Sequence, residues 1–328
     1  MATLESLQGL TIENFKEVSE PVFLNWLTAS MKKADTSAAF EWIRAIYETT
    51  EEIGATYTEF GDLGTMPKWQ NRQETENAAQ TDLPLPQFVL QPFEQWSAEF
   101  PVSREYFEQE AKIKKRYSLF RTYIQKLAAA GQDTRAALAF LPFADAFDGN
   151  YFTTPDGEPL CSTHALPGGA YINNSNLELS TTALDEMRAT PAQVFTDQGM
   201  PVTYKHNFLM VGDLLEDQAR DIVTASGAYA PGGTLYEAQN VRNKYADLSV
   251  IVNPFMRDQV LTNGDTMWFG FSTEQLTFKE IWNLRPYIEV YDWTKNLTHY
   301  IRGRQSLQHF WESPVGVYGS TGITAVSS

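Results

Sequence analysis

The sequence predicts an α+β fold, in which helices and strands are mixed without regular alternation. Helical and strand-like patterns follow one another in irregular order, whereas a doubly wound α/β fold would show repeated strand–helix–strand units. Hydrophobic residues make up 43% of the 328 residues and aromatic residues 13%, which is enough to build packed cores. The length suffices for two or three compact units, or for one core with large extensions.

Residues 1–52 are predicted to form an N-terminal arm with helical character. Aromatic and aliphatic residues recur three or four positions apart in FKEVSEPVFLNWL and AFEWIRAIYETTEE. No linker separates this stretch from the rest of the chain. We therefore expect it to pack on another part of the protein.

Residues 53–100 are predicted to form a long β-hairpin that projects from the body. IGATYTEFGDLG and QFVLQPFEQWSAEF have the β-prone, aromatic-rich character of strands, and the segment between them is largely polar. The apolar residues of such a projection have little core of their own to join. A hairpin of this size therefore predicts a neighbouring subunit that covers it.

Residues 104–141 contain the strongest helix pattern in the chain. Ser103 is a candidate N-cap, Gly131 is a position at which the helix is expected to bend or end, and Pro142 is expected to stop its continuation. Five apolar residues follow a 4-3-4-3 spacing that places them on one helix face: Ile113, Tyr117, Phe120, Ile124 and Leu127.

The second half of the chain is predicted to contain short helices and strands. TTALDEMRA and DLLEDQARDIVTA are helical patterns, with Asp213 near the start of the second, and HNFLMVG between them is a buried strand. ADLSVIVNPFM and TMWFGFS are apolar strands separated by a turn at Asn263–Asp265. SGAYAPGGT is a glycine-rich loop. The tail, from about Leu276, contains three further β-prone stretches: RPYIEVYDW, LTHYIRGR and LQHFWES.

The charge distribution argues against a nucleic-acid-binding protein. The formal net charge is −16, from 25 basic and 41 acidic residues, whereas broad nucleic-acid binding needs a basic footprint. Residues 104–126 are the exception, because they carry seven basic side chains against three glutamates. This local excess indicates either a dedicated partner surface or a solvated helix face with internal ion pairs.

The sequence lacks the patterns of several other classes of site. No glycine-rich phosphate motif and no HExxH motif occurs, and none of the four histidines has a helical metal-binding spacing. A single cysteine excludes internal disulfides and cysteine-cluster metal sites. No apolar run approaches a membrane span, and the N-terminus lacks the basic start of a signal peptide. We therefore expect no cofactor, no metal and no membrane association, and a protein that is soluble and intracellular when it is made.

The stretch DGEPLCSTHAL, residues 156–166, contains the only cysteine, Cys161, and a histidine, His164, three positions later. The pair suggests either a cysteine nucleophile with its base or a structural loop. A catalytic thiol needs thiolate character, and its histidine usually comes from a distant part of the chain. Pro159, Pro167 and nearby glycines argue against a helix, so the spacing does not bring the two side chains onto one face. The pattern favours a structural loop in which Cys161 fills an apolar position.

The order of these parts resembles the major capsid protein of tailed phages, which has the Hong Kong phage-type (Johnson) head fold. The local pattern is similar to the Mu-like branch of that family, in which a DG-x-PLFS-x-x-H segment follows the long helix. The family usually has an aromatic residue where Cys161 stands, and its histidine lies one position further along than His164. Six segments carry the resemblance, in this order: DGEPLCSTHALPGG, TTALDEMRA, NFLMVG, DLLEDQARDIVTA, LSVIVNPFM and TMWFGFS.

The resemblance implies a phage major capsid fold with five parts. In chain order these are an N-terminal arm (1–52), an extended loop formed by the long β-hairpin (53–100), a peripheral domain with a spine helix over 104–141 (101–205), a mainly axial domain (206–275), and a β-rich tail that completes the peripheral domain (276–328).

The function implied by the resemblance is structural and not enzymatic. The chain would self-assemble into hexamers and pentamers that form an icosahedral head shell around packaged phage DNA. Its partners would be further copies of itself, with portal, scaffold and decoration proteins, and the DNA would be enclosed without sequence-specific binding. It would be made in the host cytoplasm and end in the virion capsid. An encapsulin-type compartment shell and a Cys161-dependent hydrolase are the alternatives.

Candidate inter-subunit contacts follow from the basic helix and the loops. A basic cluster in the long helix is expected to pair with acidic residues of an overlying neighbour loop, such as Glu74 and Glu76. No residue is assigned to catalysis, to a cofactor or to a metal. The candidates are Lys112, Lys114, Lys115, Arg116, Trp69, Glu74, Glu76, Tyr229 and Pro231.

Overall fold

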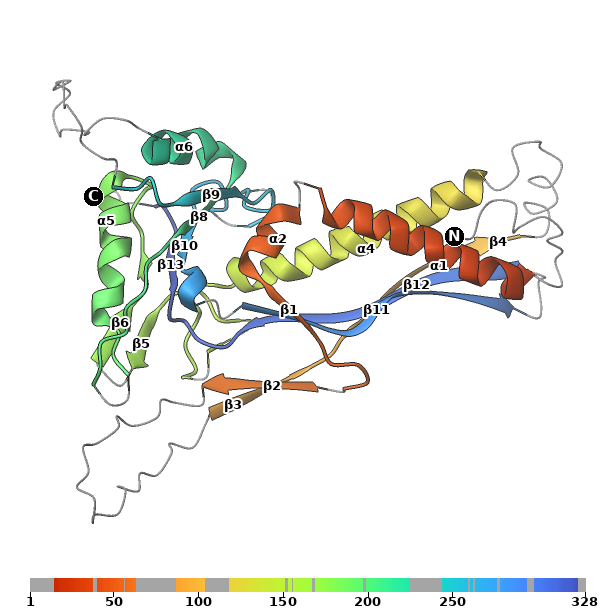
Figure 1. The fold of residues 1–328 in the computed structure, drawn as a ribbon, viewed down its shortest axis with the longest axis horizontal. Helices are drawn as coiled ribbons and strands as arrows, with labels where there is room; N and C mark the ends of the chain where they lie inside the picture. Colours follow the sequence, from red (N-terminus) through yellow and green to blue (C-terminus); the bar gives the residue numbers. More distant parts are fainter. Residues whose placement is uncertain are drawn as a thin grey trace, which may run out of the picture.

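The computed structural model consists of two larger β-sheets, a layer of helices on one of them, and a hairpin that stands apart (Figure 1). Helices and strands follow one another irregularly along the chain, which confirms the predicted α+β class. The structure describes residues 15–37, 40–55, 57–62, 87–103, 118–150, 153–154, 156–166, 169–196, 199–224, 244–258, 260–261, 263–275, 278–293 and 298–323.

The longer sheet has four strands in the order β1-β11-β12-β4. β1 joins β11 in parallel orientation, whereas the β11–β12 and β12–β4 pairs are antiparallel. The three β-prone stretches of the tail merge into the two central strands, of 16 and 14 residues. The strands are β1 (Glu48–Glu51), β4 (Gln95–Val102), β11 (Phe278–Trp293) and β12 (Thr298–Trp311).

Two long helices, α1 (Phe15–Asp35) and α4 (Ser118–Ala144), lie together on one face of this sheet (Figure 1). Apolar residues of both helices pack in one cluster with residues of β4, β11 and β12: Phe23, Leu27, Met31, Val102, Phe120, Ile124, Ala128, Ile288, Val290 and Ile301. Phe120 and Ile124 belong to the predicted stripe, so the long helix is confirmed over 118–141. Its predicted part over 104–117 lies outside the described residues.

Neither Gly131 nor Pro142 ends α4. Gly131 lies within the helix, and its carbonyl accepts a hydrogen bond from the side chain of Gln305 at 2.9 Å. The helix runs past Pro142 and ends at Ala144. A proline removes one backbone donor and crowds the preceding turn, so continuation beyond the next residues is unfavourable. The predicted stop was therefore misplaced by less than one turn.

The N-terminal arm is helical over α1 and α2 (Glu41–Ile46), as predicted for those residues. Residues 48–51 are an exception, because they form the edge strand β1. Trp42, Ile43 and Ile46 of α2 are buried, which confirms that this stretch packs on the body.

The second sheet has five strands in the order β7-β13-β10-β8-β9. α5 (Thr181–Ala189) and α6 (Glu216–Thr224) pack against it through a shared apolar cluster. The Ser180 hydroxyl accepts a hydrogen bond from the Ala183 N–H at 3.2 Å and so caps α5. The two helices and the strand predicted in this region are confirmed within residues 181–224. The strands are β7 (Asn174–Ser175), β8 (Phe208–Val211), β9 (Ser249–Val252), β10 (Trp268–Phe271) and β13 (Val317–Ser320).

Three short 3-10 helices lie in the connections that follow α5, β8 and β10, and the last of them leads to β11 of the four-stranded sheet. They are η3 (Thr190–Gln193), η4 (Asp213–Leu215) and η5 (Thr273–Gln275). η4 leads directly into α6, so the predicted amphipathic helix starts with a tighter turn at Asp213.

The tail contributes strands to both sheets. β11 and β12 lie in the four-stranded sheet, whereas β13 lies between β7 and β10 in the five-stranded sheet. β7 and α5, from the segment before residue 205, also belong with the five-stranded sheet. Strands of the tail therefore lie in both sheets. The division into peripheral and axial domains stays a prediction.

Two further hairpins complete the described chain. β2 (Tyr57–Asp62) and β3 (Gln87–Pro92) pair antiparallel in a sheet of their own, as predicted for those residues. The rest of the predicted second strand does not belong to the hairpin, because residues 95–100 lie in β4, which pairs with β12. In Figure 1 this hairpin lies on the side of the four-stranded sheet opposite α1 and α4. Its predicted polar tip, 63–86, lies outside the described residues. β5 (Thr163–Leu166) and β6 (Gly169–Ile172) form a second, shorter hairpin.

An aromatic cluster joins the end of α4 to both sheets. The ring of Phe143 lies 5.5 Å and 5.6 Å from those of Phe269 and Phe271 in β10, and 5.1 Å from that of Phe278 in β11. The Tyr47 hydroxyl donates a hydrogen bond to the carbonyl of Ala139 at 2.7 Å. The long helix is therefore anchored where the two sheets meet.

Candidate functional site

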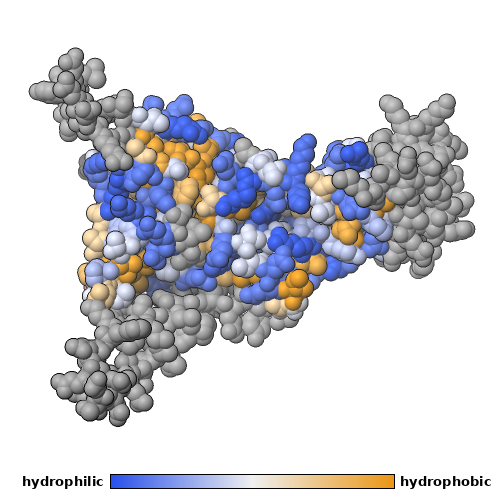
Figure 2. Space-filling model, viewed as in Figure 1, coloured by the Kyte–Doolittle hydropathy of each residue, from blue (hydrophilic) through white to orange (hydrophobic). Residues whose placement is uncertain are grey.

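The nine candidate contact residues fall in three segments, 63–86, 104–117 and 225–243. All nine lie outside the described residues, so their roles stay predictions. Figure 2 shows the face of the molecule seen in Figure 1, with a hydrophobic area over β9 beside α6. Two strongly exposed apolar side chains belong to this end of the second sheet, Leu214 in η4 and Val260 in the loop after β9, with 71% and 57% of their surface accessible.

Cys161 is buried in the apolar cluster that joins the sheets, as predicted for a structural loop. Its backbone N–H donates to the carbonyl of Ala146 at 2.7 Å. A Cβ added to Gly319 of β13 would lie 2.6 Å from the Cys161 Sγ, so the thiol fills the space beside that glycine. Burial raises the pKa of the thiol well above its ordinary value. A thiol that stays protonated and has no access to solvent does not meet the requirements of a nucleophile.

His164 is also fully buried, but it does not contact Cys161 as a base would. Its Nδ1 lies 2.9 Å from Oδ2 of Asp156, and its Nε2 lies 3.2 Å from the carbonyl oxygen of Leu160. The residue that orients the imidazole therefore comes from the Asp156–Gly157 turn of the same loop. Gly157 has a φ of +84°, which favours glycine at this turn.

Asn173 ties the same loop to the second sheet. Its side-chain amide donates to the carbonyls of Leu160 and Pro314 at 2.9 Å and 3.3 Å, and its Oδ1 accepts from the N–H of Ser162 at 2.8 Å. Its own carbonyl accepts from the N–H of Gly319 at 2.9 Å. DGEPLCSTHAL is therefore a structural connection between the end of α4 and the five-stranded sheet.

A buried ion-pair site, which the sequence reasoning missed, connects α4, β11 and α1. The guanidinium of Arg135 donates from Nε and Nη2 to the two carboxylate oxygens of Glu280 at 2.9 Å and 2.8 Å. It also pairs with Asp35 at the end of α1. Burial opposes the charge of Arg135, but Glu280 and Asp35 outweigh it and raise the pKa of the guanidinium. The sequence signal that could have indicated this site is Arg135 itself, a charged residue within the apolar stretch TRAALAFL.

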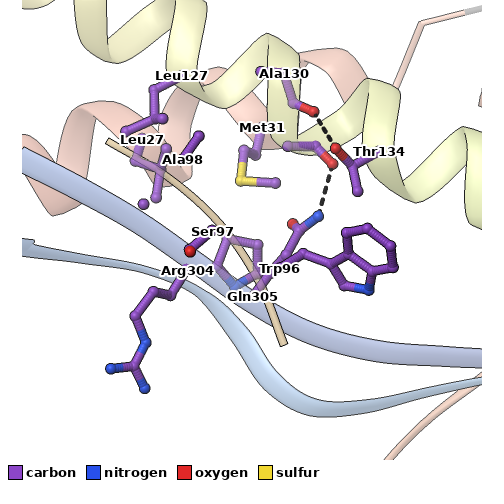
Figure 3. A pocket seen from close by; sticks show the side chains of 13 residues that line it. Leu27, Met31, Trp96, Ser97, Ala98, Leu127, Ala130, Thr134, Arg304 and Gln305 are labelled. Atoms are coloured by element: carbon purple, nitrogen blue, oxygen red, sulfur yellow. Dashed lines mark hydrogen bonds between the residues drawn. The ribbon is translucent and has the colours of Figure 1, made fainter. Parts of the chain in front are cut away.

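A small cavity lies between the helices and the four-stranded sheet (Figure 3). Its volume is about 90 Å³. The amide of Gln305 points toward α4, where it donates to Gly131, whereas the guanidinium of Arg304 points away from the cavity and pairs with Glu289 at 2.8 Å. The cavity walls are Leu27, Met31, Trp96, Ser97, Ala98, Leu127, Ala130, Gly131, Thr134, Pro286, Gly303, Arg304 and Gln305. This lining contains no acid–base pair suited to catalysis.

The described part of the chain also has no candidate metal site and no helix suited to span a membrane. Its histidine, cysteine and acidic side chains form no group of three that could hold a metal ion. None of its helices is long and apolar enough to cross a membrane. What the described residues do provide is two packed sheets and a β2–β3 hairpin that pairs apart from them.

The comparison with protein families gives the class of protein. A family model described as phage capsid protein matches residues 93–322, and the chain belongs to this family. It is a structural protein of the capsid shell, located in the virion, as the sequence resemblance implied. The narrower resemblance to the Mu-like branch stays a prediction. No curated protein sequence matches the chain.

Solved capsid structures share the fold. The capsid of an empty GTA particle computed with C5 symmetry matches with a TM-score of 0.53 and 11% identity, over 88% of this chain and 91% of that chain. The capsid of a native GTA particle, also computed with C5 symmetry, matches with the same TM-score and coverage at 10% identity. The similarity at these identities concerns the fold.

Proposed function

We propose that this capsid protein assembles into hexamers and pentamers that close an icosahedral shell around packaged phage DNA. The observation that carries the proposal is the β2–β3 hairpin, which pairs only within itself among the described strands. An isolated two-stranded hairpin is marginally stable in water and needs a surface to lie on. A neighbouring copy of the chain supplies that surface, and the exposed hydrophobic area beside α6 suits a second contact between copies (Figure 2).

The acidic charge of the chain fits a shell wall that encloses DNA without binding it tightly. A net charge of −16 repels the phosphate backbone, so the wall is not expected to read sequence. Portal, scaffold and decoration proteins are the further partners of such a shell, and synthesis takes place in the host cytoplasm. In this arrangement Trp69 belongs to the extended loop, and Tyr229 and Pro231 lie near the capsomer axis.

Electron microscopy of the purified protein tests shell formation directly. Shells or ring-shaped capsomers in negative stain are the expected result. A clean monomer by light scattering at assembly concentrations would contradict the proposal. Particles from the native source that contain protein cargo in place of DNA would instead favour the encapsulin-type alternative.

The basic cluster of the long helix is proposed to bind a neighbour's acidic loop. Reversing Lys114 and Lys115 to Glu should lower the melting temperature of assembled shells, and more so at low salt, because ionic strength screens charge pairs. The matched control is the double substitution of both lysines by Arg, which keeps the charge. Unchanged melting of the Glu variant at low salt would contradict the proposed pairing.

We further propose that the chain has no catalytic role. The buried Cys161, with its raised pKa, should react with iodoacetamide only after denaturation. Cys161→Ala should still assemble, whereas Cys161→Phe should be destabilised by about 1–3 kcal/mol, because Gly319 leaves no room for a ring. Fast labelling of the native thiol would reopen the hydrolase alternative.

A further inference from the structure

Strand β4 lies at the edge of the four-stranded sheet and has no partner on its outer side among the described strands. It pairs with β12 along its whole length, Gln95–Val102, without a shift in register. Natural proteins usually protect such an edge with lysines, bulges or very short strands. β4 is regular, contains no lysine, and its one charged side chain, Glu99, is paired with Arg302 at 2.8 Å. The edge is therefore suited to receive a further strand.

Pro101 indicates which backbone groups of β4 face outward. A proline has no N–H to donate to β12, so in a regular ladder it occupies a position that faces away from the neighbouring strand. The backbone groups of successive residues alternate in direction, so Ser97 and Glu99 direct their N–H and C=O groups to the same outer side as Pro101. Neither N–H has a backbone acceptor among the described residues outside the β12 ladder. The edge therefore offers two unused donors.

A groove runs beside this edge, between β4 and α4 (Figure 3). The cavity of about 90 Å³ lies in it, with Trp96 and Ala98 on the strand side and Leu127 and Ala130 on the helix side. Ala98 and Ala130 are exposed, so these small side chains leave the groove open to solvent. An apolar cavity of about 150 Å³ holds a benzene molecule, so a space of this size suits one aliphatic side chain.

The groove continues toward the start of α4. Tyr123 lies on the same helix face as Leu127 and Ala130, at a spacing of four and then three residues. Its side chain is 39% accessible, and its ring lies 5.3 Å from that of Phe100 in β4. An edge strand with an apolar groove beside it is the arrangement that binds an added strand. The backbone of the edge then provides affinity, and the groove selects alternate side chains.

We propose that the β4 edge and the groove beside it bind an extended strand of a second copy of this chain. The N–H groups of Ser97 and Glu99 donate to the added strand, and one of its apolar side chains fills the cavity against Leu127. The chain is a capsid protein, so its neighbours in a shell are copies of itself. The β2–β3 hairpin of a copy supplies such a strand, because each of its two strands has an unpaired outer edge in the described structure. The inference rests on the proposed self-assembly and adds the surface that receives the strand.

Hydrogen exchange of assembled shells and dissociated subunits tests strand addition directly. The amides of Ser97 and Glu99 should exchange at least about tenfold more slowly in shells than in subunits, because only the added strand gives them an acceptor. The amides of Ala98 and Phe100, which face β12, should be protected in both states. Equal exchange of Ser97 and Glu99 in the two states overturns the proposal. Protection of both amides already in dissociated subunits does so too, because the chain itself then covers the edge.

A proline at the edge tests the backbone contact. Ser97→Pro removes one outward N–H and leaves the bonds to β12 in place, as Pro101 does in the natural sequence. The protein concentration at which half of the chains are assembled should rise by at least about fivefold, because each contact loses a hydrogen bond. Ser97→Ala keeps the N–H and should assemble like the wild type. Denaturant unfolding of dissociated subunits shows whether both variants fold.

A substitution in the groove tests the side-chain contact and covers the case in which Ser97→Pro does not fold. Ala129 and Ala130 are both exposed on α4, but only Ala130 lines the cavity. Ala130→Arg should therefore hinder assembly, whereas Ala129→Arg, the matched control, should not. Wild-type assembly of both Ser97→Pro and Ala130→Arg overturns this inference and leaves shell formation intact. A wild-type chain that stays monomeric overturns the proposed self-assembly, and this inference with it.

Discussion

At the scale of single residues, Arg135 and Glu280 form a charged pair in the interior of the protein. Both side chains are almost inaccessible to solvent, and two parallel hydrogen bonds join them. Removing charges from water is costly, and a bidentate pair offsets much of that cost. The pair therefore contributes chiefly by fixing how α4 and β11 lie against each other, with Asp35 adding the end of α1.

Breaking this pair from one side should be strongly destabilising. Arg135→Met leaves the carboxylate of Glu280 buried without its cationic partner and should lower the free energy of unfolding by about 3–5 kcal/mol. Urea denaturation measures the change. The double variant Arg135→Met with Glu280→Leu should recover most of the loss, since no charge then remains buried. A single variant within about 1 kcal/mol of wild type would contradict this account.

At the scale of elements, two glycines lie where α4 packs on β12, and they differ in the space available for a side chain. A Cβ at Gly131 would meet the Gln305 Oε1 and the Met31 Cε at 3.4 Å and 3.5 Å, which is ordinary contact at the edge of the cavity in Figure 3. A Cβ at Gly303 would meet the side chain of Leu127 at 2.9 Å. A methyl group therefore fits at Gly131 in α4, whereas at Gly303 in β12 it would overlap with Leu127.

Alanine substitutions at the two glycines should change stability in opposite directions. Gly131→Ala should stabilise the protein by about 0.5–1 kcal/mol, because a glycine within a helix costs conformational entropy. Gly303→Ala should destabilise it by about 1–3 kcal/mol through overpacking against Leu127. Both values come from denaturant unfolding under identical conditions. Changes of the same sign would show that local packing does not decide either effect.

The long hairpin of β11 and β12 shows how an element tolerates an unfavourable residue. Its pairing register shifts between Trp282 and Leu284 and again between Leu284 and Tyr287. Pro286 lies within the second irregularity. Because a proline lacks the N–H that a regular ladder needs, this interruption is where it is accommodated.

At the scale of the whole molecule, two buried histidines are expected to lower the stability of the folded protein as the pH falls. Burial lowers the pKa of His206 to about 3 and that of His309 to about 4, and the charge of Arg188 and that of Arg135, respectively, add to the effect. Glu280, opposite His309, partly counteracts it. Both histidines are neutral in the folded state, whereas in the unfolded chain they take up protons below about pH 6.5.

The protein should therefore lose stability as pH falls from about 6.5 toward 4. Each of the two histidines adds a slope of up to about 1.4 kcal/mol per pH unit, because the unfolded state binds more protons. Urea midpoints at pH 7, 6 and 5 measure the loss. His309→Leu should reduce the slope, whereas Lys126→Gln, an exposed site, should leave it unchanged. A wild-type midpoint that is constant from pH 7 to 4.5 would contradict the prediction.

The sequence by itself determined the α+β class, most local elements and the family. The stripe with Phe120 and Ile124 predicted α4, because periodicity reflects which face of an element is buried. The apolar run HNFLMVG predicted β8, and helical patterns predicted the short helices α5 and α6. The proline and glycine context of residues 156–166 correctly argued against a helix around the buried Cys161, but it did not predict that Thr163–Leu166 form strand β5. The nine candidate contacts in the loops and the basic helix stay predictions.

Only the tertiary structure decided how distant segments combine. Periodicity does not say which strands pair, so the sequence could not show that β13 leaves the tail's own sheet to lie between β7 and β10. It also could not show that Arg135 meets Glu280, 145 positions away, or that His164 faces Asp156 and Leu160. Such contacts depend on the three-dimensional path of the chain, and a buried charge is stable only where that path brings its partner within hydrogen-bond distance.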